Sequence, residues 1–169
     1  MKKPVISLLI AVVCFTASAQ QNVVKINPLG QLIGAASVSY EKTLSPSSSF
    51  QINGLFGGMT FSDFSYSTWG AGADYKFYLT KSKVAPRGFY IAPGLAYNNM
   101  NFKVDTEKAS ASAFAIKGML GYQWIWGGFD LDLFAGLNYT LGGKVTVSGS
   151  DYSVNGFGPA LGVAIGYAF

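Results

Sequence analysis

Two carboxylates lie two residues apart in the segment FDLDLFAGLNY, at Asp130 and Asp132. If this segment is a β-strand, both side chains point to the same face, and paired carboxylates on one face permit acid–base chemistry. A glycosidase pair would need an open cleft between the two groups, and the sequence indicates none. We therefore interpret the two carboxylates as ion-pair partners for lysines across a barrel.

The residues that usually carry catalysis are scarce. The chain has no histidine and one cysteine, Cys14. A Ser–His nucleophile system is therefore impossible, and metal catalysis is poorly supported, because there is no histidine nitrogen ligand and Cys14 falls in a segment expected to be removed. We expect no enzyme activity, no catalytic residue, no metal site and no cofactor.

The elements that would position these charges alternate with a period of two residues, which is typical of strands. Segment 129–139 places Phe129, Leu131 and Leu133 on one face and Asp130 and Asp132 on the other. One face is large and apolar, and the other is small, polar or charged. We predict eight strands, at 22–29, 35–44, 49–61, 67–80, 88–104, 111–126, 129–148 and 151–169, with turn residues between them.

The first nineteen residues have the pattern of a cleaved secretory signal peptide, with Lys2 and Lys3 before an apolar run that contains Cys14. The alternative is an uncleaved anchor. Residues 20–169 then form a single domain without cysteine. The formal charge is +4, and removing Lys2 and Lys3 leaves 4 − 2 = +2, with the basic residues scattered. We therefore expect no nucleic-acid partner.

Alternating strands can close into two kinds of barrel. A soluble barrel turns its apolar face inward, whereas a transmembrane barrel turns it toward lipid. The polar face here is mostly glycine, alanine, asparagine and glutamine, which suits a narrow lumen better than a solvated surface.

Aromatic spacing supports the transmembrane barrel. Three pairs on one face are each ten residues apart: Phe114 and Trp124, Phe129 and Tyr139, and Phe157 and Tyr167. Ten residues rise about 33 Å along a strand, which a tilt of roughly 40° projects to ~25 Å, the height of the apolar band of such barrels. These residues are the predicted aromatic girdles. The fold class is therefore all-β, a closed antiparallel transmembrane barrel, most simply an eight-stranded up-and-down meander, with ten strands as an open alternative.

The leader, the amphipathic strands and the ending VAIGYAF together resemble the small single-domain outer-membrane β-barrels of Gram-negative bacteria, of the OmpA transmembrane-domain and OmpX type. The resemblance implies an integral outer-membrane location after export, contact with outer-membrane lipids and lipopolysaccharide, and a monomer. It also implies that Ile165, Tyr167 and Phe169 form the C-terminal signal recognised by the barrel-assembly machinery.

Seven charged residues are expected in the lumen, and we interpret them as a packed plug of ion pairs. They are Lys25, Glu41, Asp74, Lys76, Lys117, Asp130 and Asp132. The alternative is an ion path or a proton relay.

Four functional classes remain open. We favour a structural or surface-interaction protein in which hairpins, one of them at 145–154, project outside the cell and meet a protein partner or only shield the barrel mouth. A narrow channel for small or hydrophobic solutes is the alternative. A lipid-acting enzyme is disfavoured because such barrels use histidine. A soluble ligand-binding barrel is the last class.

Overall fold

The computed structural model describes residues 22–31, 34–62, 64–104, 107–147 and 150–169. The predicted signal peptide, 1–19, and the tip of the 145–154 hairpin at 148–149 lie outside these residues. The described strands are β1 (Asn22–Ile26), β2 (Ala35–Ser45), β3 (Ser48–Phe61), β4 (Phe64–Tyr78), β5 (Gly88–Val104), β6 (Glu107–Trp126), β7 (Phe129–Val147) and β8 (Ser150–Ala168).

These eight strands form a closed barrel in which each strand pairs with its neighbour in sequence and β8 pairs back to β1. Every neighbouring pair is antiparallel, from β1–β2 to β7–β8 and the closing pair β1–β8. The predicted all-β, antiparallel closed barrel is therefore confirmed, with eight strands rather than ten among the described residues. No helix among them is long and apolar enough to cross a membrane.

The first strand is shorter than predicted. It ends at Ile26, and Pro28–Gln31 form a short helix, α2. Proline has no N–H for a strand ladder but fits the first turn of a helix, which explains the change of structure at this position. The prediction that this strand runs to residue 29 was wrong.

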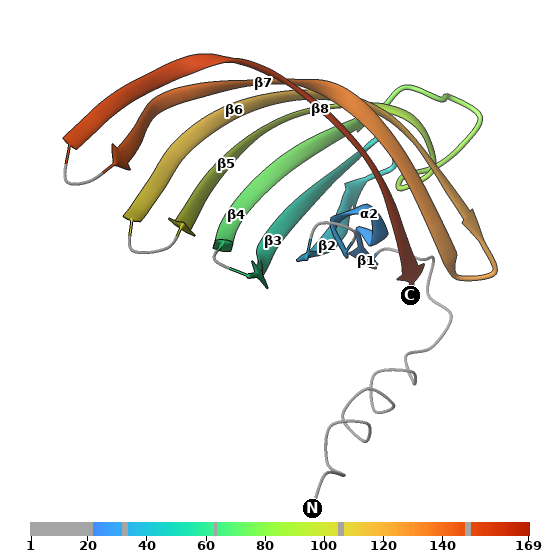
Figure 1. The fold of residues 1–169 in the computed structure, drawn as a ribbon. Coiled ribbons are helices and arrows are strands. Elements are labelled where there is room, and N and C mark those ends of the chain that lie inside the picture. The colour runs from blue at the N-terminus through green and yellow to red at the C-terminus, as the bar shows by residue number, and fades with distance from the viewer. Residues whose placement is uncertain (1–21, 32–33, 63, 105–106, 148–149) are drawn as a thin grey trace, which may run out of the picture.

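Strand lengths differ strongly around the barrel. β1 has 5 residues and β2 has 11, whereas β6, β7 and β8 have 20, 19 and 19. Figure 1 shows the long strands arching away from the end where β1 and the C-terminus lie side by side. We call this the C-terminal end of the barrel, and the opposite end the far end. The connections 46–47, 79–87 and 127–128 lie at the C-terminal end because successive strands are antiparallel.

The tightest connection at the C-terminal end is the two-residue turn between β6 and β7. Gly127 and Gly128 both have positive φ, 55° and 97°, and Trp126 pairs with Phe129 across them. Two successive positive φ angles are the geometry of a type I′ hairpin, which glycine adopts without steric cost.

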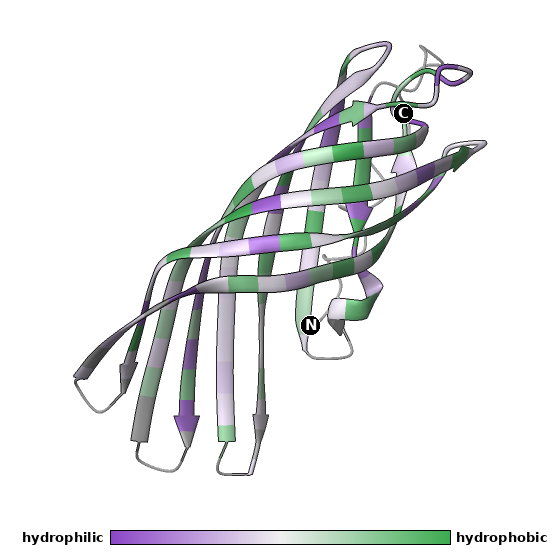
Figure 2. Cartoon of the chain, turned by 90° about the horizontal axis from the view of Figure 1, so that it is seen from above, coloured by the Kyte–Doolittle hydropathy of each residue, from purple (hydrophilic) through white to green (hydrophobic). Residues whose placement is uncertain are grey.

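Hydrophobic and hydrophilic residues alternate along the strands, as Figure 2 shows. The large apolar side chains project outward: Phe157 is 78% exposed, Leu161 73% and Phe114 63%. The buried residues include Lys25, Glu41, Lys76, Asp130 and Asp132. This is the reverse of the usual distribution in a soluble protein. The barrel is therefore apolar outside and polar inside.

Candidate functional site

Two lysines and two carboxylates form a closed ring of ion pairs inside the barrel, which we call the lysine–carboxylate ring. Lys25 Nζ lies 2.6 Å from Glu41 Oε2 and 2.7 Å from Asp132 Oδ2. Lys76 Nζ lies 3.2 Å from Glu41 Oε2 and 2.7 Å from Asp132 Oδ2. All four side chains are at most 2% exposed. Each charge therefore contacts two charges of opposite sign, which offsets the cost of removing it from water.

Asp130 adds a third buried carboxylate beside the ring. Its Oδ1 accepts a hydrogen bond from Gln123 Nε2 at 2.7 Å, and its Oδ2 lies 3.9 Å from Lys25 Nζ. No hydrogen bond reaches Oδ2 from the described residues. With all groups ionised, two lysines face three carboxylates, so the group carries one excess negative charge.

Two tyrosines complete the hydrogen bonds of the ring. Tyr90 donates its hydroxyl proton to Asp132 Oδ1 at 2.7 Å. The Tyr78 hydroxyl lies 2.6 Å from Glu41 Oε1 and 2.7 Å from Gln123 Oε1, and its single proton is donated to one of these oxygens at a time. The ring is thus held by strands on all sides of the lumen.

The small face of β8 makes room for this ring. Gly166 pairs with Lys25 on one side and with Asp130 on the other. A Cβ atom at Gly166 would lie only 3.0 Å from Lys25 Cγ. Because β8 presents glycine and alanine to the lumen here, the Lys25 side chain on β1 passes β8 and reaches Asp132 on β7.

A second polar layer lies further from the C-terminal end. Lys117 Nζ lies 2.8 Å from Asp74 Oδ1, and Asn53 Nδ2 donates to Asp74 Oδ2 at 2.5 Å. The Lys117 side chain is 20% exposed, so this layer is less enclosed than the ring. A cavity of ≈ 180 Å³ lies between the two layers, and Phe134 is among its lining residues.

The C-terminal end is closed by apolar residues. Val23, Ile125 and Ala168 form a buried cluster there. The loop between β4 and β5 also folds against this end: Ala85 is 6% exposed, and its N–H donates to the Pro46 carbonyl at 2.9 Å. An apolar layer, the lysine–carboxylate ring and the Asp74–Lys117 pair thus occupy successive levels of the lumen.

The carboxylate oxygens of the ring are already occupied by donors. The oxygens of Glu41 and Asp132 contact lysine, tyrosine or serine donors, so neither carboxylate is open to a substrate. The described residues contain no group of three or more His, Cys, Asp or Glu side chains arranged to hold a metal ion.

All seven predicted lumen charges point inward in the structure. Five of them gather in or beside the ring, while Asp74 and Lys117 form a separate pair. Sequence reasoning did not assign a role to Ser49, Tyr78, Tyr90 or Gln123. Tyr78 lies two residues after Lys76, and Gln123 lies six residues after Lys117. Because both separations are even, the period of two places Tyr78 and Gln123 on the same lumen-facing sides of their strands.

Aromatic side chains form a belt on the outer surface toward the far end, which we call the far belt. Ring centroids are 5.5 Å apart for Trp69 and Tyr97, 4.8 Å for Tyr97 and Phe114, and 4.7 Å for Tyr139 and Phe157. The contacts join neighbouring strands from β4 to β6 and from β7 to β8.

A second belt, the near belt, lies at the C-terminal end. Tyr122, Trp124, Trp126 and Phe129 follow one another with centroid separations of 4.3, 6.3 and 6.2 Å. Phe129 pairs with Tyr167 on β8. Of the predicted girdle residues, Phe114, Tyr139 and Phe157 therefore lie in the far belt, and Trp124, Phe129 and Tyr167 in the near belt.

The three residues of the predicted assembly signal lie at the end of β8. Ile165 pairs with Ile26 and Leu131, on the same outward face as Tyr167. Phe169 lies beyond the strand and exchanges two backbone hydrogen bonds with Asn22, at 2.9 and 3.0 Å. The last residue is therefore fixed against β1.

Comparisons with known proteins agree with this architecture. A family model described as "Protein of unknown function (DUF3575)" matches residues 5–143. The crystal structure of Acinetobacter baumannii CarO is similar, with a TM-score of 0.56 and 12% identity over 92% of this chain and 100% of that chain. That of Acinetobacter baumannii CarO2 has a TM-score of 0.54 and 11% identity over 88% of this chain and 97% of that chain. At these identities the likeness concerns the fold. No curated protein sequence matches.

Proposed function

This chain belongs to the family of proteins of unknown function DUF3575, and we propose that it is an integral outer-membrane β-barrel with a side-chain-packed lumen and a structural or surface-interaction role. Closed barrels are one of the two structures that leave no backbone group unpaired in lipid. The likeness to the two CarO structures supports a barrel fold for this role.

The observation that carries the proposal is the inverted surface. Large apolar side chains cover the outside between two aromatic belts, while the charged groups are buried inside. Leu95, Leu137 and Leu161, which lie between the belts, are 62%, 58% and 73% exposed. Such a band would be costly in water, and it matches the lipid-facing band of outer-membrane barrels.

We assign the C-terminal end to the periplasm, because both termini of an even-stranded barrel of this type lie there. The far ends of β3 to β8 then project on the extracellular side beyond the far belt. The β7–β8 hairpin is among the longest of these projections, with Val147 paired to Ser150 before its tip. Such hairpins offer a surface to lipopolysaccharide or to a protein partner.

The alternative of a narrow channel is favoured by one observation, the ≈ 180 Å³ cavity between the two polar layers. Passage would require the lysine–carboxylate ring to open, and each of its four charges has two opposite partners. We therefore favour a barrel with a side-chain-filled lumen over a narrow channel. A lipid-acting enzyme stays disfavoured, because the sequence contains no histidine.

Membrane fractionation with gel mobility of unheated and boiled samples tests the proposal. We expect an outer-membrane protein whose unheated form migrates differently from the boiled form, since a closed barrel resists detergent. A soluble periplasmic protein without a heat-dependent shift would reject it. Conductance in planar bilayers separates the two barrel functions, because an occluded lumen gives no steady current and a channel does.

A further inference from the structure

Charge is distributed unevenly between the two ends of the barrel. The four acidic residues whose side chains are described, Glu41, Asp74, Asp130 and Asp132, all point into the lumen. Two further acids in the described strands, Glu107 and Asp151, belong to the first residues of β6 and β8, at the far end. The loop 79–87 at the C-terminal end instead carries Lys81, Lys83 and Arg87 and no acid. The outer rim of this end is therefore basic.

This basic loop has a defined structure. Thr80 anchors it, because its carbonyl accepts from Lys83 N at 3.0 Å and its Oγ1 accepts from Phe89 N at 2.9 Å. Ala85 and Pro86 are buried against the barrel end, whereas Val84 is 64% exposed. The loop thus holds an apolar side chain and exposed cations at the rim without the conformational freedom of a long flexible loop.

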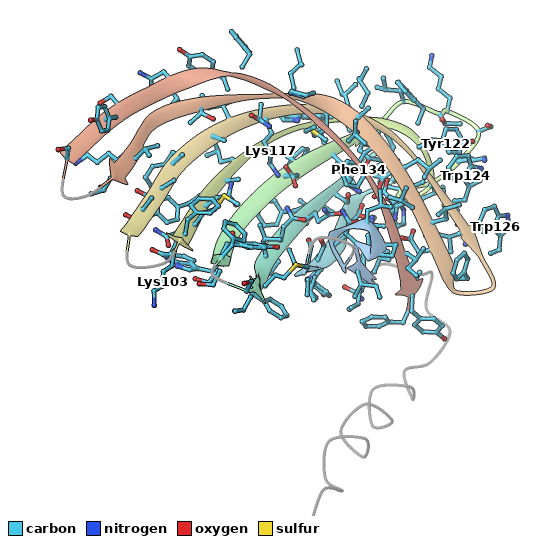
Figure 3. The ribbon with its side chains drawn as sticks, viewed as in Figure 1. Lys103, Lys117, Tyr122, Trp124, Trp126 and Phe134 are labelled. Carbon is cyan, nitrogen blue, oxygen red and sulfur yellow. The ribbon has the colours of Figure 1, made fainter. Side chains whose placement is uncertain are left out.

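One of these cations, Lys83, contacts the near belt directly. Lys83 Nζ donates to Tyr122 Oη at 2.8 Å and lies 5.2 Å from the centroid of that ring. A cavity of ≈ 420 Å³ lies between the loop and β6, lined by Lys83, Val84, Arg87, Trp124 and Trp126. Figure 3 shows Tyr122, Trp124 and Trp126 together at this end, with Lys103 at the opposite end.

Given the proposed function, on which this step rests, the cavity opens where the lipid headgroups of the periplasmic leaflet lie. Indole rings favour the boundary between headgroups and acyl chains, and lysine and arginine beside them bind phosphate. We propose that this cavity binds the headgroup of an anionic phospholipid, with the phosphate held by the basic loop and the upper acyl chains against Trp124 and Trp126. The absence of acidic side chains on the described outer surface of this end favours an anionic over a zwitterionic headgroup.

The three tryptophans of the chain make the test position-specific. Trp69 lies in the far belt, whereas Trp124 and Trp126 line the cavity. Trp69→Phe leaves fluorescence from the cavity alone, and the double variant Trp124→Phe/Trp126→Phe leaves it from the far belt alone. Both variants are inserted into phosphatidylcholine vesicles that contain a minor fraction of a lipid brominated near the headgroup. In one preparation the brominated lipid is phosphatidylglycerol, and in the other it is phosphatidylcholine. The two leaflets have the same composition, so the direction of insertion does not matter.

We expect brominated phosphatidylglycerol to quench Trp124 and Trp126 more strongly than brominated phosphatidylcholine, with a local enrichment on the order of fivefold for each lysine involved. Lys81→Gln/Lys83→Gln in the Trp69→Phe background should weaken this preference strongly, with Arg87 left as the remaining cation of the loop. The matched control, Lys103→Gln at the far end, should retain it. Trp69 should be quenched equally by both lipids.

Equal quenching of Trp124 and Trp126 by the two lipids, or loss of the preference in Lys103→Gln, would overturn the lipid site. An unchanged preference in Lys81→Gln/Lys83→Gln would also overturn it, because the basic loop would then not hold the phosphate. Trp69 without quenching by either lipid would instead reject membrane insertion, and with it the proposed function.

Discussion

Replacing Lys76 by methionine tests whether the lysine–carboxylate ring holds the barrel together. Methionine keeps most of the volume of the side chain but removes the ammonium group, which contacts Glu41, Asp132 and Gln123 at 3.2, 2.7 and 3.2 Å. It also removes the charge that lies 4.3 Å from the centroid of the Tyr90 ring. Lys25 then faces three carboxylates alone, so the excess negative charge rises from one to two.

Removal of one partner from a buried ion pair costs about 3–5 kcal/mol, because the remaining charge stays buried and uncompensated. Lys76 is 2% exposed, so little water is available to replace the lost contacts. A cost in this range lowers the ratio of folded to unfolded protein by about two to four powers of ten. Lys76→Met should therefore shift the denaturant midpoint strongly.

Urea unfolding in detergent micelles, followed by tryptophan fluorescence and by gel mobility, measures this loss. Lys103→Met is the matched control, since Lys103 is exposed at the far end, and it should unfold as the wild type does. Lys76→Met/Asp132→Asn should recover part of the stability, because it removes one carboxylate and returns the excess negative charge from two to one, while Lys25 keeps its contact with Glu41. If Lys76→Met lowers the free energy of unfolding by less than about 1 kcal/mol, the ring contributes little to stability. If the effects of Lys76→Met and Asp132→Asn on that free energy simply add, the two side chains are not energetically coupled.

Three further changes have clear expectations. Gly166→Val should prevent the barrel from folding, since the valine side chain would collide with Lys25 and the backbone of β1. Gly118→Ala should fold normally, because nothing lies within 4 Å of its added Cβ. Gel mobility of unheated samples distinguishes the folded from the unfolded variant. Leu161→Arg, between the belts, should cost about 2–4 kcal/mol of unfolding free energy in lipid vesicles, and Tyr152→Arg, beyond the far belt, about 0–1 kcal/mol; equal costs would contradict the assigned membrane position. Gly127→Val should cost about 1–2 kcal/mol in urea unfolding because its φ is 55°, and an unchanged midpoint would show that the turn relaxes to another geometry.

The sequence predicted the barrel and its two faces because side-chain direction in a strand depends only on position parity. Asp130 and Asp132 share a face in any strand, and Phe157 and Tyr167 share the other. Contacts between distant strands do not follow from parity. Lys25 meets Asp132 only because β1 closes on β8, and this depends on the register of the closing pair.

Tyr90 and the loop 79–87 show two other limits. Tyr90 belongs to a strand rich in asparagine, glycine and aromatic residues, where the two faces differ less in polarity, so its hydrogen bond to Asp132 was not predicted. The loop was expected as a turn, but its burial against the barrel end depends on contacts with Pro46 and β6 that are far away in sequence. Helix α2 was missed because the segment NPLG was interpreted as a turn, and proline fits a turn as well as the first turn of a helix.

Closure of the barrel depends on few backbone contacts. β1 meets β8 over four residue pairs, Val23–Ala168 to Ile26–Ile165, whereas β7 meets β8 from Phe129–Tyr167 to Val147–Ser150. Lys25 belongs to this short interface, and its ammonium group reaches across β8 to Asp132. An open sheet would leave Lys25 on one edge strand and the carboxylates of β7 near the other, with their charges unmatched. Because the short ladder and the ion pairs depend on the same approach of β1 to β8, we expect the charges inside the lumen to couple the closing step to the formation of the ring.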